Sequence, residues 1–408
     1  MRERVESSRV AVIGGSIAGC ATAIALGRLG CDVEVFERSS GVLRDRGSGI
    51  VIPLPLRDEL IGAGYLPADY PSCVPSRRHW AVADGTDDGA LLWRQPSAGA
   101  MSNWGVLWRS LRAGVPDRQY HDGVSVAAIN AHSDGTSISF DDGTTSTFDV
   151  VVGADGYNSM VRSVVADVAE PHYAGYVLWR GNFPESRLDD RSRIEILDAD
   201  RAWLTVGFDG GHAVMYPIPE FDGDASAGNR RINWAIYAPK PEGLEVASPS
   251  LIAPGAVTNG VYRQLEDLIH KTIPPTMRPL FASPREEVSI QPIYDVSVDR
   301  YVKDRVALIG DAATVTRPHT GSGATKAMQD ARTLELLGGE HRDWDSLLAA
   351  YDADRVAVGR SLVDLGRRIG RDQVECTPPW AAMDADDFAE WTAGTLSGET
   401  LYFWGNED

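Results

Sequence analysis

Two glycine-rich turns, one near each end of the chain, carry the residue types that a long phosphorylated cofactor needs. In the later turn, an apolar run over residues 306–309 leads to Asp311, and a loop through Gly321 and Gly323 opens a helical pattern. In the earlier turn, an apolar run over residues 10–13 is followed by a small-residue helix and then by Glu37. Carboxylates at strand ends accept bonds from sugar hydroxyls, and the free amides of a helix start bind anions. The two turns together indicate that the chain wraps one extended cofactor, and we predict FAD.

The earlier turn departs from the strict dinucleotide pattern at one of its three glycine positions. Gly14 and Gly19 occupy the places of the tight turn and of the helix–strand contact, whereas Ser16 replaces the glycine that faces the pyrophosphate. The order strand, turn, helix, strand and acid still favours dinucleotide binding over a purely structural turn. The residues predicted to contact the cofactor here are Gly14, Gly15, Ser16, Ile17, Ala18, Gly19, Glu37 and Arg38.

A third segment joins this predicted site. Asp155 and Gly156 follow a strand pattern over residues 148–152 and would be a plain turn if they stood alone. In the later segment, the positive end of the helix can face the electron-rich edge of reduced flavin. Lys326, one turn into that helix, either adds to this positive charge or belongs to a solvated face. The cofactor contacts predicted in the later segment are Asp311, Pro318, Gly321, Ser322, Gly323 and Ala324.

The elements that must position these residues follow two kinds of pattern. Residues 10–37 read as strand, helix and strand, while residues 125–152 and 176–237 alternate like strands. We predict a mixed α/β fold: a Rossmann-like FAD-binding domain with a parallel sheet, an antiparallel-sheet substrate domain, and C-terminal helices. The FAD-binding domain is expected to be discontinuous, over residues 1–75, 100–170 and 290–372, with a substrate domain at 76–99 and 171–289 and a C-terminal extension at 373–408.

The amino-acid composition limits the classes of partner that the protein could bind. The 408 residues carry a formal net charge of −19, which argues against nucleic acid and anionic membranes because both attract basic surfaces. We find no secretory leader and no apolar run long enough to span a membrane, so we expect a cytoplasmic protein. The four cysteines show no metal-type spacing, and we predict no metal site.

With all three segments in view, the chain resembles the group-A FAD-dependent aromatic hydroxylases built like p-hydroxybenzoate hydroxylase. The matching stretches are GGSIAG with Glu37, GADGYNSMVR at residues 153–162 and GDAATVTRPHTGSG at residues 310–323. Within that family, it is most similar to the N-heterocycle hydroxylases of the 2,6-dihydroxypyridine 3-hydroxylase type. This closer similarity rests on HYAGYVLWRG at residues 172–181, YPIP at residues 216–219 and RPH at residues 317–319.

The resemblance implies roles along one FAD molecule. Glu37 would bind the adenosine ribose, and the amides of residues 15–17 would meet the pyrophosphate. Asp311 would bind the ribitol, with the loop of residues 318–323 beside the isoalloxazine, and Asp155 with Gly156 would serve both FAD and the nicotinamide donor. Two arginines are weaker cofactor candidates: Arg46, which precedes a glycine pair together with Arg44, and Arg109, which lies one place from the family's usual position.

The resemblance also implies a reaction. NAD(P)H would reduce FAD, O2 would form the flavin C4a-hydroperoxide, and an electron-rich ring would attack its distal oxygen. The substrate would be a small phenolic or hydroxypyridine-like molecule whose hydroxyl group is deprotonated or strongly hydrogen-bonded. The candidates for that activating contact are His319, His212 and Tyr216, with Tyr237 beside them.

Each candidate has a competing structural interpretation. His212 follows two glycines and is expected to lie exposed in a hairpin, while Tyr216 and Tyr237 are typical of packed aromatic positions. Arg180 could steady a carboxylate or the flavin, or could pair with an acid. The acidic segment after Cys376 could cap the substrate cavity or make contacts in a homodimer.

Other functions stay open at this stage. The same fold could support an epoxidase, a Baeyer–Villiger oxygenase or a halogenase, although the tryptophan motif expected of a halogenase is only faintly present near Trp234. A non-catalytic FAD-binding redox sensor is the third alternative.

Overall fold

The computed structural model describes residues 4–41, 48–132, 135–166, 170–189, 203–246 and 251–396. One half is built on a six-stranded sheet in the order β17-β18-β11-β1-β2-β7, in which only the β17–β18 pair is antiparallel. Its strands are β1 (Arg9–Ile13), β2 (Asp32–Glu37), β7 (Tyr120–Asp122), β11 (Val150–Gly153), β17 (Val302–Lys303) and β18 (Val306–Leu308).

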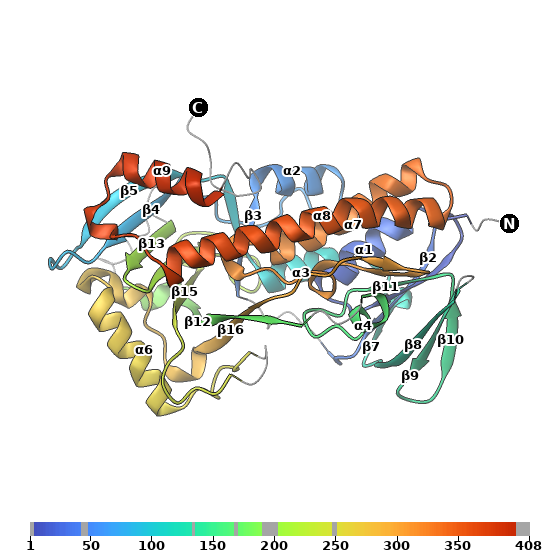
Figure 1. Cartoon of the computed structure of the whole chain (residues 1–408), viewed down its shortest axis with the longest axis horizontal. Helices are drawn as coiled ribbons and strands as arrows, with labels where there is room; N and C mark the ends of the chain where they lie inside the picture. The colour runs from blue at the N-terminus through green and yellow to red at the C-terminus, as the bar shows by residue number, and fades with distance from the viewer. Residues whose placement is uncertain are drawn as a thin grey trace.

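This parallel sheet is covered by helices, which explains why its central strands are uninterrupted apolar runs. Every residue of β11 and β18 is buried, as expected for strands covered on both faces. Helix α1 (Ile17–Arg28) buries ten consecutive small or apolar residues and packs against α7 (Ser322–Glu340). The start of α7 therefore lies beside the β1–α1 unit, although the two are far apart in sequence (Figure 1).

The other half is a seven-stranded, mostly antiparallel sheet in the order β16-β12-β15-β14-β13-β4-β5. Side chains on one of its faces form a core with α6 (Asn259–Thr272), which covers that face (Figure 1). The opposite face of this sheet lines a cavity. The strands are β4 (Arg77–Val82), β5 (Ala90–Pro96), β12 (His172–Pro184), β13 (Trp203–Phe208), β14 (Gly211–Ile218), β15 (Arg231–Pro239) and β16 (Ser289–Asp295).

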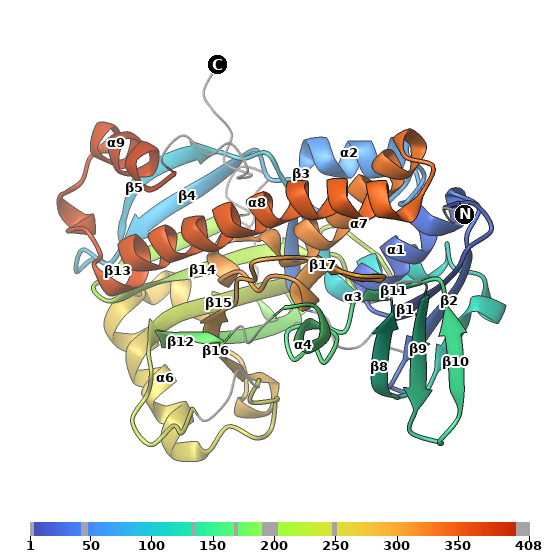
Figure 2. The same cartoon turned by 45° about the vertical axis from the view of Figure 1, so that its right-hand side comes forward.

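Helix α8 (Trp344–Gly370) runs along both halves, as Figure 2 shows. Beyond it, α9 (Ala385–Leu396) packs on β4 and β5 through rings that include Trp80, Trp380 and Phe388. The smaller elements are the pair β3 (Gly49–Pro53) and β6 (Gly99–Asn103), the sheet β8 (Val126–His132), β9 (Gly135–Phe140) and β10 (Thr145–Phe148), and the helices α2 (Leu54–Gly62), α3 (Trp104–Arg112) and α4 (Arg162–Val165).

The predicted fold class is confirmed: a parallel sheet and an antiparallel sheet are joined by C-terminal helices. The domain boundaries stay a proposal, with the pairing of β4 to β13 as their main support for residues 76–99. No helix in the described ranges combines the length and apolarity needed to cross a membrane.

Candidate active site

Two cavities meet between the sheets. The first, of about 660 Å³, extends from the β1–α1 turn, and the second, of about 450 Å³, lies under the open face of the seven-stranded sheet. Both volumes fall within the range of about 300–1,000 Å³ that is usual for small-molecule sites. The two cavities share six lining residues, Ile50, Trp104, Arg180, Asp311, Gly323 and Ala324. The shared residues mark the place where a ligand in one cavity would touch a ligand in the other.

The β1–α1 turn has the geometry of a phosphate-binding turn. Gly14 has a left-handed backbone with φ of +103°, and a Cβ on Gly19 would overlap the carbonyl oxygen of Gly14. Ser16 is the N-cap residue of α1 but makes no side-chain cap, and the first turn of α1 holds no acid. The amides at the start of this helix have no intrahelical acceptor, so they are available to an anion.

Glu37 is held at the end of β2 by two backbone amides. Its carboxylate accepts hydrogen bonds from Gly15 and Ser39, both at 2.8 Å, and it lines the first cavity together with Arg38. The Gly15 amide, which we expected to meet the pyrophosphate, donates to Glu37 in this structure, so its contact with the cofactor stays a prediction. The Gly15 carbonyl is also occupied: it accepts bonds from the indole of Trp108 (3.0 Å) and the hydroxyl of Tyr120 (2.9 Å).

Arg162 joins the segment that contains Asp155 to the segment that contains Asp311. Its guanidinium donates to the carbonyl oxygens of Ala312 (2.9 Å) and Tyr157 (2.6 Å), which lie on the two segments. This contact holds Asp155 and Asp311 at the rim of the first cavity. Loss of water raises the pKa of both carboxyl groups.

The start of α7 presents amides at the junction of the two cavities. Gly321 adopts a left-handed backbone with φ of +62°, and the first turn contains no acid. Lys326 does not lie on a solvated face, so that expectation is wrong. It is 1% exposed, and its ammonium group contacts Asp330 (2.6 Å) and the carbonyl of Gly310 (3.2 Å) rather than either cavity.

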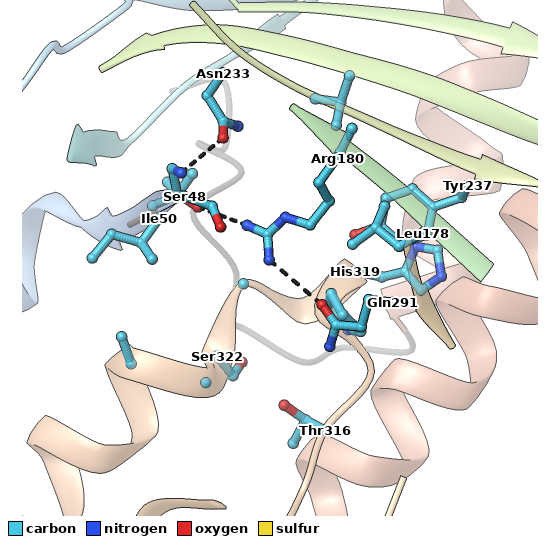
Figure 3. Close-up of a pocket in the computed structure, with 18 of the residues that line it drawn as sticks. Ser48, Ile50, Leu178, Arg180, Asn233, Tyr237, Gln291, Thr316, His319 and Ser322 are labelled. Carbon is cyan, nitrogen blue, oxygen red and sulfur yellow. Dashed lines mark hydrogen bonds between the residues drawn. The ribbon is translucent and has the colours of Figure 1, made fainter. Parts of the chain in front are cut away.

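The second cavity is lined by alternate residues of the antiparallel strands, because successive side chains of a strand point to opposite faces. Arg180, one of the residues that the two cavities share, lies between the Gly49 carbonyl (3.3 Å) and the Gln291 side-chain oxygen (3.5 Å) (Figure 3). No carboxylate of the described residues pairs with it, so the acid-pairing interpretation is not supported. The sheet residues that line this cavity include Leu178, Arg180, His212, Val214, Tyr216, Asn233, Ala235, Tyr237, Ser289 and Gln291.

Three rings form a cluster on this lining. The ring centroid of Tyr237 lies 4.0 Å from that of His319, and Figure 3 shows these two rings together. The Tyr237 centroid is 4.6 Å from that of His212, and the two imidazoles are 5.5 Å apart. His212 is only 2% exposed, so its predicted exposed position is wrong. Burial, reinforced by the positive charge of Arg78, lowers the pKa of His212 to about 3. Burial, reinforced by His212, Arg317 and Arg78, holds the pKa of His319 well below its usual value, so both rings are neutral near pH 7.

Most of the predicted site residues line one of the cavities. Tyr216 lies in the second, where burial raises its pKa to about 12. Pro318, Gly321, Ser322, Gly323 and Ala324 line the second as well, while Ser16, Ile17, Ala18 and Gly156 line the first. Gly15, Gly19 and Arg109 line neither. Arg46 and its neighbour Arg44 lie outside the described residues.

The predicted catalytic and cofactor contacts left out several residues of the site. Trp104 lines both cavities, and Asn233 fixes β3 by accepting a bond from the Gly49 amide at 2.7 Å. Tyr176, on β12, contacts His319 directly. The two-residue period of β12 and β15 could have identified Tyr176 and Asn233, because each shares a face with an already predicted residue.

Comparisons with known proteins agree with this geometry. Residues 9–50 match the pyridine nucleotide-disulphide oxidoreductase family, residues 173–280 an FAD binding domain-like family and residues 262–366 the FAD binding domain family. The 2,6-dihydroxypyridine 3-monooxygenase of Paenarthrobacter nicotinovorans is 30% identical over 369 residues, covering 88% of this chain and 89% of the relative. The 3-amino-4-hydroxybenzoate 2-monooxygenase of Streptomyces cremeus is 29% identical, covering 80% and 77%. The solved 2,6-dihydroxypyridine-3-hydroxylase of Arthrobacter nicotinovorans superposes with a TM-score of 0.81 at 25% identity, covering 98% of both chains.

Proposed function

The chain belongs to the group-A FAD-dependent aromatic hydroxylases, and from this premise we propose that it adds a hydroxyl group to a small hydroxylated aromatic or N-heteroaromatic ring, with NAD(P)H as electron donor and O2 as co-substrate. One observation supports the proposal above the others. A cavity lined by aromatic and imidazole rings opens, at the start of α7, onto a cavity with the features of a dinucleotide site.

The described residues fit FAD along the first cavity. Glu37 would take the adenosine ribose, and the amides opening α1 would take the pyrophosphate, since Gly14 and Gly19 leave the required room. Asp311 would bind the ribitol, and the amides of Gly323 and Ala324 would face the electron-rich edge of the ring. When bound there, FAD supplies the redox chemistry, namely acceptance of hydride and activation of O2.

The residues of the second cavity would bind and orient the substrate ring. Tyr237, His212 and Leu178 offer flat and apolar surfaces for stacking, and burial of the chamber keeps water away from the reacting carbon. His319 and Tyr216 offer polar contacts to a ring oxygen. Contacts that stabilise that oxygen in its ionised form raise the electron density of the neighbouring carbon, which is the atom to be hydroxylated.

The electron donor is proposed to bind transiently. Within the described ranges, one glycine-rich β–α–β unit is present, and FAD is assigned to it. The nicotinamide would then have to approach the flavin from the shared rim near Asp155 and Gly156, reduce it and leave.

The test is a panel of hydroxypyridines, phenols and hydroxybenzoates mixed with the FAD-loaded enzyme and either NADH or NADPH. We expect at least one ring compound to stimulate oxidation of the donor and to gain one oxygen atom. His319→Ala should lower the stimulated rate at unchanged FAD content, whereas His270→Ala, on the outer helix α6, should not. A yellow protein that oxidises no donor with any ring compound would favour the redox-sensor alternative.

A further inference from the structure

The imidazole of His319 has one occupied nitrogen and one free nitrogen. Its Nε2 lies 2.8 Å from the hydroxyl of Tyr176, and that hydroxyl also lies 3.3 Å from the Nη1 of Arg317. The Nδ1 atom is buried and has no hydrogen-bond partner among the described residues. His319 is one of the residues that line the second cavity.

The direction of these hydrogen bonds follows from the donors present. Arg317 can only donate, so the Tyr176 oxygen accepts from it. Tyr176 is 2% exposed, and among the described residues the only acceptor for its proton is Nε2 of His319. If Nε2 carried a proton instead, the buried hydroxyl proton would be left without an acceptor, which is costly. The neutral imidazole therefore carries its proton on Nδ1, the ring nitrogen that has no partner among the described residues.

Arg317 is held firmly enough to impose this direction. Its Nε donates to Asp295 at 3.0 Å, and its Nη1 donates to Glu375 at 2.9 Å. Asp295 is fully buried and also accepts from Arg367 at 2.6 Å. The end of α8 packs closely on Tyr176 and Arg317, because a Cβ on Gly370 would overlap the Tyr176 hydroxyl.

The charges around the second cavity favour an anion. Its charged lining residues among those described are Arg78, Arg180 and Asp311, and Asp311 belongs to the loop shared with the first cavity. The two arginines carry positive charge at this lining and attract a negatively charged ring, in a protein whose net charge is −19. An Nδ1–H donor beside two guanidinium groups is suited to an oxygen that carries negative charge.

We propose that Tyr176 and Arg317 are positioning residues that keep the His319 proton on Nδ1, so that His319 donates a hydrogen bond to the anionic oxygen of a ring substrate instead of taking its proton. The substrate class is then a phenol or hydroxypyridine acidic enough to bind as its oxyanion. The inference rests on the proposed hydroxylase function, because it assigns the contact that activates the ring. His319 is a poor base in this arrangement: Nε2 is occupied, and the neighbouring Arg317 and Arg78 disfavour an imidazolium.

The first test reads the tautomer without any variant. Nitrogen-15 NMR of the histidine-labelled, FAD-loaded enzyme distinguishes protonated from bare ring nitrogens. We expect His319, assigned through the His319→Asn spectrum, to show a protonated Nδ1 and a bare Nε2. A protonated Nε2 would overturn the proposal whether or not any substrate is known.

The second test separates a donor from a base. Ionisation of a bound hydroxypyridine or phenol is followed by its absorbance in the oxidised enzyme, where no turnover occurs. We expect the ring to ionise about tenfold more readily in the wild type than in Tyr176→Phe, a shift of about one pH unit. The matched control Tyr173→Phe, also on β12 but outside both cavities, should leave the ionisation unchanged.

His319→Asn completes the design, because asparagine keeps an N–H donor but cannot act as a base near pH 7. It should retain most of the wild-type ionisation and a measurable kcat, whereas His319→Ala should lose both. Equal loss in the two variants would contradict the donor role. If no ring compound binds or stimulates donor oxidation, the proposed function and the assigned substrate class are both wrong. The positioning role of Tyr176 and Arg317 is tested separately, by the His319 tautomer measured by NMR.

Discussion

Substitution of Asp330 offers a quantitative check on how the flavin-side loop is held. Asp330 is fully buried and accepts hydrogen bonds from Lys326 (2.6 Å), from Arg355 (2.7 Å) and from the Gly310 amide (2.9 Å). Asp330→Asn preserves the size of the side chain but removes the buried negative charge that Lys326 and Arg355 share. Breaking a buried pair in this way costs about 3–5 kcal/mol. Since Gly310 precedes Asp311, FAD binding should weaken as well.

The matched control is Asp354→Asn, which removes the other carboxylate near the same arginine. Asp354 lies 3.4 Å from Arg355, and its side chain is half exposed, so the loss should be at most about 1 kcal/mol. Both variants are compared with the wild type by urea unfolding of the FAD-free protein, followed by titration with FAD. If Asp330→Asn unfolds within about 1 kcal/mol of Asp354→Asn, the account of the buried cluster is refuted.

Three further predictions follow from the same structure. Gly19→Ala should abolish stable FAD binding in a protein that still folds by circular dichroism, because the added Cβ would overlap the Gly14 carbonyl; an unchanged flavin spectrum would contradict this. Arg180→Met should raise the KM for an anionic ring at least about tenfold at constant FAD content. A loss of about 1.4 kcal/mol of charge attraction corresponds to a tenfold loss of binding. An unchanged KM would exclude Arg180 from substrate binding. Of the four cysteines, only the exposed Cys376 should react quickly with a thiol reagent in the native protein. Burial raises the pKa of the other three thiols, to about 12 for Cys20 and Cys31 and about 11 for Cys73. Rapid labelling of more than one thiol would show that these side chains are not buried.

The parts of the site that depend on local pattern were predictable from the sequence. The β1–α1–β2 unit is specified by a short apolar strand, a glycine turn and a terminal acid within one stretch, so the positions of Gly14 and Glu37 could be inferred. The same holds for the start of α7, where a left-handed residue is needed and Gly321 supplies it.

The errors arose where distant segments cover a residue. His212 follows a glycine turn and looks exposed, but the segment after α8 closes over it, with the Gln373 carbonyl 3.4 Å from its ring. Lys326 and Asp330 have the spacing of a surface helix pair, yet Arg355 from α8 packs against them and excludes water. Neither contact is encoded in a local pattern.

The aromatic strands illustrate a different limit. Tyr237 faces the cavity, while Trp234, on the same strand, and Trp179, on the neighbouring strand β12, face the core under α6. The aromatic composition of these strands does not say whether a ring lines the cavity or packs in the core, because that depends on the face of the sheet that each residue occupies. Only the pairing of β12 with β15 assigns each ring to its face.

The most direct test of the central claim is the fate of the oxygen. The FAD-loaded enzyme, a ring compound that stimulates donor oxidation and isotopically labelled O2 are incubated together, and the product is examined by mass spectrometry. The account predicts one labelled oxygen atom on the ring for each NAD(P)H consumed, with loss of this coupling in His319→Ala. Consumption of NAD(P)H and O2 with an unlabelled ring would contradict it, since the second cavity would then not hold the ring where the oxygen is transferred.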